Sequence, residues 1–185
     1  YSGIGQAGYI LLPFALASGD LALDGAAFSA AVTYILIYSV MTVGAFAVVT
    51  ALAGESKGLL VEDLAGFGRR SPLLAVAMTT FMVALAGVPP TAGFWAKLFV
   101  FSAAIDRGGI GIALAVAMVL NSVISLGYYL SIPRAMMFLP PSTDRTVRVP
   151  VSVRLVALAA VAAVLVVGVY PQALAVFPPL ATLVG

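Results

Sequence analysis

The chain has 185 residues, of which 63% are hydrophobic and only 9% are charged. A soluble domain carries roughly 25% charged residues, so this composition excludes an ordinary soluble protein. The absence of histidine and cysteine excludes Ser-His-Asp and Cys-His catalysis, thiolate zinc sites, cysteine-ligated iron–sulfur clusters and histidine-ligated haem.

The charged side chains are clustered. The uncharged runs between them cover residues 1–19, 25–54, 71–96, 108–133 and 155–185. Each run is close to, or longer than, the roughly 20 residues with which a helix spans a bilayer. We therefore predict an all-α polytopic membrane protein surrounded by lipid. The net charge of +2 is spread over many loops, so no nucleic-acid partner is expected.

We predict one membrane domain with six transmembrane helical segments. In chain order they are 3–19, 27–53, 72–88, 92–105, 110–137 and 153–170. A short acidic loop that ends at Asp24 and Gly25 is expected between the first two. Residues 54–70 form a hydrophilic connection, in which the stretch 59–68 is expected to be a surface hairpin or a short amphipathic helix. Ser71 and Pro72 predict a helix start, with serine as the N-cap and proline in the first turn.

One helix is expected to break at Pro89-Pro90, because two consecutive prolines remove two N–H donors. If both sides of the break cross the membrane, there are six crossings, and the basic loop residues divide four to four between the faces. If 72–105 is one broken crossing, they divide seven to one, which the positive-inside rule prefers. Charge alone leaves both arrangements open.

Lys97 is the candidate proton-transfer residue, since it lies in the apolar stretch 93–101. A cation at membrane depth costs about 2.5–3.5 kcal/mol. Lys97 follows Thr91 by six residues, or roughly 9 Å of helical rise, which is deep for a lysine that reaches the headgroups. A buried lysine, unlike arginine, can exchange its proton. The alternative is an anchor or a structural ion pair.

The helix break and several polar side chains are the expected surroundings of Lys97. A break at Pro89, Pro90 and Gly93 frees carbonyls that hold water or a cation where they line a cavity. Hydroxyl and amide side chains recur at near-helical spacing in three of the segments. The candidates for lining a water chain are Tyr38, Thr42, Thr79, Asn121, Ser125 and Tyr128. Ordinary interhelical hydrogen bonds, worth about 0.6 kcal/mol each, are the alternative.

A nucleotide site is not expected, although Gly3, Gly5 and Gly8 match the G-x-G-x-x-G pattern. That pattern binds dinucleotides only after a strand in a βαβ unit, and here it opens an apolar membrane run. We expect no cofactor and no metal in this chain.

Two motifs carry a resemblance to a known family. Residues 1–9 (YSGIGQAGY) and 85–97 (LAGVPPTAGFWAK), with Asn121-Ser122 and Tyr128-Tyr129, resemble the antiporter-like proton-pumping subunits of respiratory complex I. Among these, the chain looks most like the N-type subunits of bacterial NADH:quinone oxidoreductase. The resemblance covers essentially all 185 residues.

The resemblance implies a fold and a site. It implies the second of two inverted repeats plus the last helix, and it favours six crossings. It also implies a C-terminal part of a longer protein, as does the first residue, Tyr1, which is not an initiator. Lys97 would match the lysine of the family's broken helix. Three positions depart from the family: Gln6 replaces a frequent histidine, Ala96 a usual glycine, and Thr42 a lysine of the sister subunits.

The expected function is proton translocation through a half-channel centred on Lys97, coupled to electron transfer elsewhere. NADH, FMN, iron–sulfur clusters and quinone are expected in partner subunits, and other complex I membrane subunits as partners, notably the neighbouring antiporter-like subunit. The expected location is the bacterial inner membrane. The alternatives are a subunit of a multi-subunit Na⁺/H⁺ antiporter, or a non-catalytic membrane spacer in which Lys97 only pairs with a carboxylate.

Overall fold

The computed structural model describes residues 2–53, 61–140 and 149–176, and every regular element in this part of the chain is helical. The α-helices are α1 (Ser2–Ala15), α2 (Leu21–Ala53), α3 (Phe67–Arg70), α4 (Pro72–Ala86), α5 (Ala92–Arg107), α6 (Ile110–Phe138) and α7 (Val151–Val169). Two 3₁₀ segments, Val61–Leu64 and Pro171–Val176, complete them. Helices α2, α6 and α7 are long and apolar enough to cross a membrane. The predicted all-α membrane fold is confirmed.

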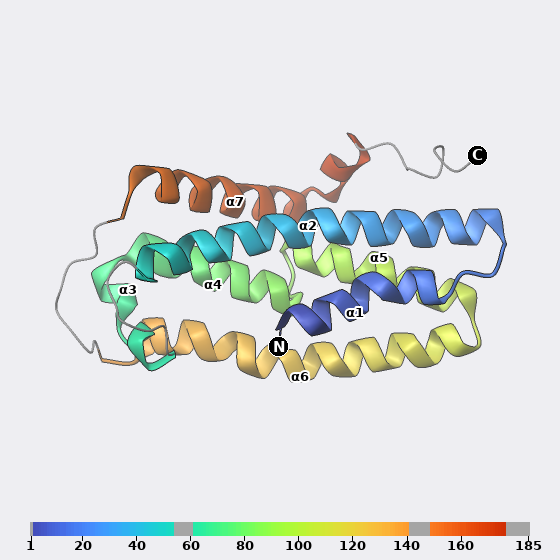
Figure 1. The fold of residues 1–185 in the computed structure, drawn as a ribbon, viewed down its shortest axis with the longest axis horizontal. Helices are drawn as coiled ribbons and strands as arrows, with labels where there is room; N and C mark the ends of the chain where they lie inside the picture. The colour runs from blue at the N-terminus through green and yellow to red at the C-terminus, as the bar shows by residue number, and fades with distance from the viewer. Residues whose placement is uncertain (1, 54–60, 141–148, 177–185) are drawn as a thin grey trace.

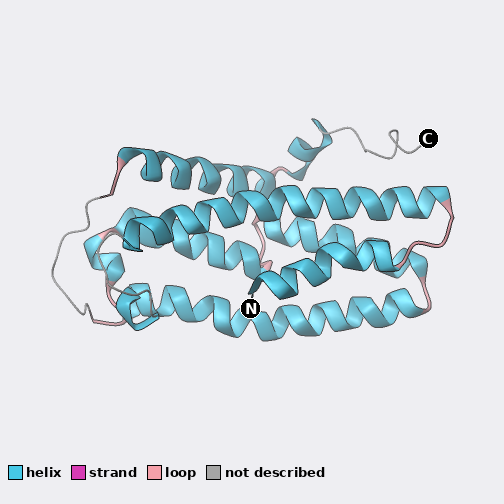
Figure 2. Cartoon of the chain, viewed as in Figure 1, coloured by secondary structure: helices cyan, strands magenta, loops and turns pink. Residues whose placement is uncertain are grey.

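Helix α2 is the central element of an elongated bundle and packs against α1, α4, α5 and α7. Figure 1 shows α2 and α6 running along the whole bundle, with α4 and α5 between them and α7 on the outer side of α2. A helix that is apolar on all sides suits a membrane helix of which one face packs in the bundle and the other faces outward. Gly44 permits the close packing, because a Cβ there would lie 2.3 Å from the Phe81 ring and 2.7 Å from Ala160. The connections between the helices are short where they are described (Figure 2).

Helices α4 and α5 follow one another along the long axis of the bundle rather than lying side by side (Figure 1). They have 15 and 16 residues, or about 22–24 Å each at the helical rise, whereas the apolar core of a bilayer is roughly 30 Å thick. Together they form one broken passage. The six predicted helical segments are therefore present among the described residues, and two of them, α4 and α5, share one passage.

This arrangement decides how the positive charges divide. Helix α3, the C-terminal end of α6 and the N-terminal end of α7 lie at one end of the bundle (Figure 1). They carry Arg69, Arg70, Arg134 and Arg154, whereas the last turn of α5 carries Arg107 to the opposite end. Among these described arginines the division is four to one, which is the kind of uneven distribution that the positive-inside rule prefers. Lys57, Arg145 and Arg148, which also entered the charge argument, lie outside the described residues.

Helix α2 begins at Leu21, six residues before the predicted start, so the acidic loop is shorter than expected. The acidic side chains cap the helix instead of interrupting it. The Asp20 carboxylate accepts from the backbone N–H of Ala22 at 3.0 Å and of Leu23 at 3.2 Å, the usual role of aspartate at a helix N-terminus. Asp24 accepts from the N–H groups of Ser18 and Gly19.

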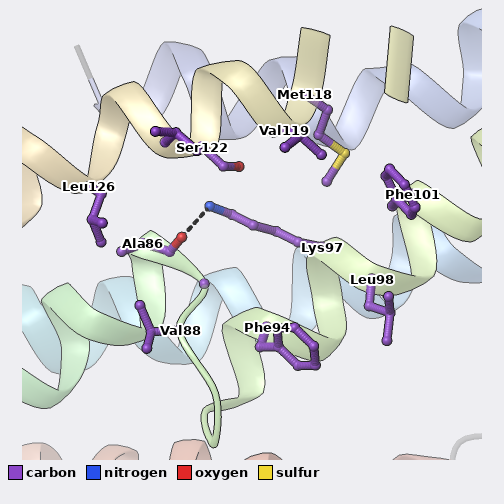
Figure 3. Close-up of a pocket in the computed structure, with 12 residues that line it drawn as sticks. Ala86, Val88, Phe94, Lys97, Leu98, Phe101, Met118, Val119, Ser122 and Leu126 are labelled. Atoms are coloured by element: carbon purple, nitrogen blue, oxygen red, sulfur yellow. Dashed lines mark hydrogen bonds between the residues drawn. The ribbon is translucent and has the colours of Figure 1, made fainter. Parts of the chain in front are cut away.

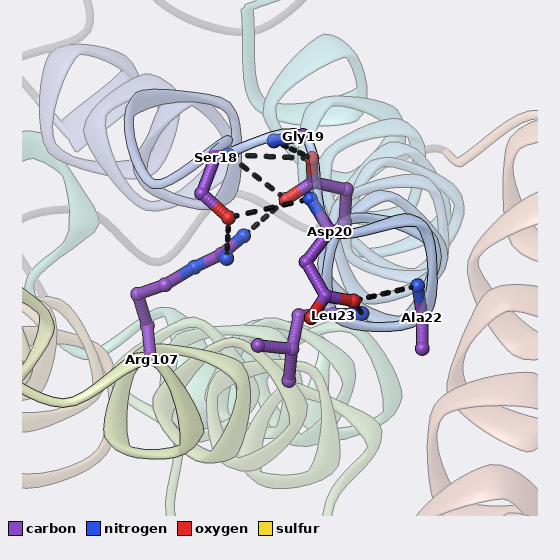
Figure 4. Close-up of polar contacts among 7 residues, drawn as sticks. Ser18, Gly19, Asp20, Ala22, Leu23 and Arg107 are labelled. Atoms are coloured by element: carbon purple, nitrogen blue, oxygen red, sulfur yellow. Dashed lines mark hydrogen bonds and ion pairs between the residues drawn. The ribbon is translucent and has the colours of Figure 1, made fainter.

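An ion pair joins this helix start to the end of α5. The Arg107 guanidinium donates to the Asp24 carboxylate and to the Ser18 hydroxyl, and Figure 4 shows it pointing at the α1–α2 connection. We call Ser18, Asp24 and Arg107 the end clip. It ties the start of α2 to the far end of the broken passage.

Residues 61–71 form neither a hairpin nor one amphipathic helix, but a 3₁₀ turn followed by the short helix α3. The Gly66 N–H donates to the Ala135 oxygen of α6 at 3.1 Å, which anchors this connection. Ser71 occupies the N-cap position of α4 and Pro72 its first residue, as predicted, but the Ser71 side chain makes no capping bond. The remainder of the predicted connection, 54–60, lies outside the described residues.

Candidate proton-transfer site

Lys97 lies on α5, one and a half turns after the break, and its side chain points back towards the end of α4 (Figure 3). The residue is only 9% exposed. Its Nζ donates a hydrogen bond to the Ala86 oxygen at 2.8 Å. The lysine therefore binds the carbonyl end of one half of the broken passage from the other half.

The break leaves carbonyls without partners in their own helix, as helix C-termini do. The Gly87 N–H turns back to the oxygens of Val83 and Ala84, with Gly87 in the left-handed conformation at φ 85°. The next two oxygens accept from side chains of other helices: Leu85 from Gln6 at 3.3 Å and Ala86 from Lys97. Side chains thus take over the bonds that a continuing helix would have made.

Glycine is required on both sides of the break. A Cβ at Gly93 would lie 1.8 Å from the Ala84 oxygen, so only glycine lets α5 approach the end of α4 this closely. A Cβ at Gly87 would lie 2.7 Å from Cδ of Lys97, and the positive φ there disfavours any other residue as well.

Among the described residues, no carboxylate forms an ion pair with Lys97. The Arg107–Asp24 pair lies elsewhere, at the end of the bundle. Two weaker interactions surround the ammonium group. The carbonyl end of a helix stabilises a partly buried cation by up to about 2 kcal/mol. The Tyr9 ring lies 5.2 Å from Nζ, and a desolvated cation–π contact contributes about 2 kcal/mol. Together they are similar to the insertion cost of about 2.5–3.5 kcal/mol, so a charged lysine is tolerated without a carboxylate.

A cavity of about 400 Å³ opens beside Lys97, between α5 and α6. We call it the lysine cavity. Its walls are mostly apolar, with Phe94, Phe101 and Met118 among them (Figure 3). Ser122 on α6 contributes a hydroxyl to the wall. The volume is large enough for water, and Lys97 and Ser122 are the polar side chains in the wall that would bind it.

A second cavity of about 400 Å³ lies between α1, α2, α4 and α6. We call it the tyrosine cavity, because Tyr38, Tyr128 and Tyr129 line it together with Thr42. The Thr42 hydroxyl is buried and has no hydrogen-bond partner among the described residues. By contrast, the hydroxyls of Thr79 and Thr80 bond the carbonyls four residues earlier in their own helix. A buried hydroxyl left open in this way is a binding point for water.

Two hydrogen-bonded clusters on α1 contact residues of the cavity walls. The Gln6 amide donates to the Tyr129 hydroxyl at 2.8 Å and accepts from Tyr34, and Tyr129 also bonds Ser2. One turn further along α1, the Tyr9 hydroxyl accepts from Asn121 at 2.8 Å and bonds Ser122 at 3.2 Å. From the sequence, Gln6 was named only as a departure from the family, and neither Gln6 nor Tyr9 was predicted as part of the site. Two polar residues three apart in an apolar run were a signal.

The predicted polar residues separate into groups. Tyr38, Thr42 and Tyr128 line the tyrosine cavity. Asn121 holds Tyr9 over Lys97. Ser125 donates to the Ser122 oxygen of its own helix, and Thr79 to the Ala75 oxygen of its own. Thr79 is not among the residues that line the two cavities described above, and its part in a water chain stays a prediction.

The match to a family model decides the relationship of this chain to known proteins. Residues 1–125 match the family described as NADH:quinone oxidoreductase/Mrp antiporter, transmembrane. The chain belongs to this family. The match includes both halves of the broken passage and Lys97, and it ends before Tyr128 and Tyr129 of the tyrosine cavity.

Curated relatives within the family carry the name subunit N. The chain is 41% identical over 182 residues to F(420)H(2) dehydrogenase subunit N of Methanosarcina mazei, which covers 93% of this chain and 35% of the relative. It is 46% identical over 153 residues to NADH-quinone oxidoreductase subunit N 2 of Sorangium cellulosum, covering 82% of this chain and 29% of the relative. The predicted resemblance to the N-type subunits is confirmed. The chain spans about a third of these relatives' length.

Solved structures agree with this assignment. The fold is similar to a chain of respiratory complex I from Thermus thermophilus with bound Aureothin, with a TM-score of 0.74 and 30% identity over 94% of this chain and 38% of that one. It is also similar to a chain of the Mrp complex from Dietzia sp. DQ12-45-1b, with a TM-score of 0.81 and 24% identity over 95% and 40%. The second likeness shows a shared fold. The predicted polytopic membrane location is confirmed, and a bacterial inner membrane is consistent with the bacterial relatives.

Proposed function

We propose that this chain is part of a proton-translocating subunit of an NADH:quinone oxidoreductase, in which Lys97 accepts and releases the proton. The subunit N names of the relatives support the assignment to the complex. NADH, FMN, iron–sulfur clusters and quinone belong to partner subunits in this proposal. The other membrane subunits, notably the neighbouring antiporter-like subunit, are the direct partners.

The observation that carries the proposal is the environment of Lys97. The ammonium group is held by the Ala86 oxygen and the Tyr9 ring rather than by a carboxylate. The Ala86 carbonyl and the Tyr9 ring stabilise the ammonium charge but carry no negative charge themselves. When Lys97 loses its proton, no unpaired carboxylate is therefore left beside it. The lysine cavity beside Nζ provides the space for a water molecule to deliver or remove the proton.

A change of charge in a neighbouring subunit is sufficient to move this proton. One unit charge at about 10 Å contributes about 1.7 kcal/mol at an effective dielectric constant of 20. That energy changes a protonation equilibrium more than tenfold. Electron transfer in partner subunits can therefore control Lys97 through a local charge, with no redox group in this chain.

Lys97→Ala in the complete complex, reconstituted into proteoliposomes, tests the proposal. We expect proton transport coupled to quinone reduction to fall by at least about tenfold, in the range typical for loss of a proton-transfer group. Assembly should be retained, as judged by subunit content and by reduction of a water-soluble acceptor by the peripheral subunits. Proton transport at the unchanged rate in an assembled Lys97→Ala complex would disprove the role of Lys97.

The two alternative functions make different predictions. A Na⁺/H⁺ antiporter subunit predicts sodium-dependent proton flux without electron transfer, and the likeness to the Mrp complex supports only the shared fold. A membrane spacer, in which Lys97 only carries charge, predicts that Lys97→Arg keeps full activity. Sodium-free buffers and Lys97→Arg therefore distinguish the three functions.

A further inference from the structure

Gln6 on α1 is 2% exposed and contacts three other helices through one amide group. Both of its N–H groups are used, one by the Leu85 oxygen at 3.3 Å and one by the Tyr129 hydroxyl at 2.8 Å, and its oxygen accepts from Tyr34. Because a backbone oxygen only accepts, the Leu85 contact determines which end of the amide is nitrogen. The side chain is therefore held in one orientation.

The Leu85 oxygen that Gln6 holds is adjacent in the chain to the Ala86 oxygen that Lys97 holds. These are carbonyls of the last turn of α4, and the chain continues through Gly87 to Pro89-Pro90, where prolines offer no N–H for a further turn. The N–H groups of Gly87 and Val88 turn back to the oxygens of Val83 and Ala84, so the Leu85 and Ala86 oxygens receive their hydrogen bonds from side chains. Gln6 supplies the donor to Leu85 from α1.

The same face of α1 also holds the other side of the lysine. Tyr9 lies three residues after Gln6, so both side chains project from one face of the helix. Its ring lies against Nζ of Lys97, and its hydroxyl is held by Asn121 and Ser122 of α6. One turn of α1 thus controls the carbonyl end and the aromatic ring that stabilise the cation.

We propose that Gln6 is a positioning residue for Lys97: it holds the last turn of α4 where the Ala86 oxygen accepts the hydrogen bond from Nζ. The proposal rests on the proposed function of Lys97. Gln6 itself transfers no proton. Without its bond to Leu85, the end of α4 moves away from Nζ, and the protonated lysine loses part of its stabilisation.

Gln6→Met in the complete complex tests this, because methionine fills a similar volume without a hydrogen bond to Leu85. We expect the decline of proton pumping at alkaline pH to move to lower pH by about half a unit, the size expected for a weakened helix-end contact. The pH profile is measured in proteoliposomes, with quinone reduction recorded in the same samples. Should Gln6→Met fail to assemble, Gln6→Asn, whose amide is too short to reach Leu85, carries the same expectation.

Tyr34→Phe is the matched control. It removes the donor to the Gln6 oxygen but leaves the Gln6 bond to Leu85, so its pH profile should coincide with that of the unchanged complex. An unshifted profile in the Gln6 variant, or an equal shift in Tyr34→Phe, would overturn the positioning role. If Lys97→Ala stops pumping while the Gln6 variant keeps an unshifted profile, the positioning role fails and the function of Lys97 stands. If Lys97→Ala pumps normally, the function fails as well.

Discussion

The two described cations of the broken passage, Lys97 near its centre and Arg107 at its end, are stabilised in different ways. Arg107 pairs with the carboxylate of Asp24 at the partly exposed end of the bundle. Lys97 is buried and binds a backbone oxygen and an aromatic ring. Both cations belong to α5, only ten residues apart in the sequence.

The difference shows how one helix separates permanent from exchangeable charge. An arginine in an ion pair stays charged at all physiological pH values. The ion pair with Asp24 therefore holds helices together and exchanges no proton. A lysine whose ammonium group contacts only a carbonyl oxygen and an aromatic ring has no carboxylate to hold its proton. A neighbouring charge can therefore change its protonation equilibrium. The end clip therefore holds α5 in place, while the centre of the helix carries the group proposed to move protons.

The largest effect should come from filling the close contact at the break. Gly93→Ala places a Cβ 1.8 Å from the Ala84 oxygen, so α5 cannot pack against α4. We expect the subunit not to assemble, measured as its absence from the purified complex. At the end of the bundle, the Cβ of Gly19→Ala meets nothing within 4 Å, so this variant carries only the strain of its positive φ, roughly 1–2 kcal/mol. Equal assembly of the two variants would contradict the tight packing at Gly93.

The next effect comes from exchanging the two types of cation. Lys97→Arg keeps the charge but prevents release of the proton, so we expect proton pumping to fall about as far as in Lys97→Ala. The reciprocal change, Arg107→Lys, keeps a cation beside Asp24 and should leave the pumping rate within about twofold of normal. Both rates are measured in proteoliposomes. Full pumping by Lys97→Arg would instead support the membrane spacer.

The smallest effect is expected at the end clip. Asp24→Asn removes the carboxylate that accepts from Arg107 but retains an oxygen for the N–H groups of Ser18 and Gly19. Because the pair is partly exposed, we expect the thermal midpoint of the complex to fall by at most about 2 °C, and less at high salt. Thermal unfolding of the complex at low and at high salt measures the fall of the midpoint and its dependence on salt. A large fall that is independent of salt would show that the clip is not mainly electrostatic.

The helical segments and the break were predictable because their causes are local. Uncharged runs of sufficient length form helices in a bilayer, and Pro89-Pro90 interrupts one of them in any context. The start of α2 was placed six residues too late, because Asp20 and Asp24 were assigned to a loop, whereas they cap the helix. An acidic residue near a helix boundary fits both interpretations, and only its hydrogen bonds distinguish them.

The arrangement of the two half-helices was not predictable from charge alone. A four-to-four or a seven-to-one division of basic residues followed from the same sequence, depending on whether α4 and α5 cross separately. Because α4 and α5 lie end to end, the described arginines divide unevenly between the two ends of the bundle (Figure 1). Close approach at Gly93 supports this placement, since a Cβ there would lie 1.8 Å from the Ala84 oxygen at the end of α4.

The amino-acid sequence by itself determined a helical membrane protein with one interrupted helix and one lysine at depth, because hydropathy, helix length and proline chemistry act over short stretches of chain. Only the tertiary structure decided what surrounds that lysine. The Ala86 oxygen, the Tyr9 ring and the Gln6 amide come from segments far apart in the sequence, and which of them meet depends on how α1, α4 and α5 pack. The local sequence therefore determines the ionisable group of the proposed proton-transfer site, and the packing of the helices determines which groups surround it.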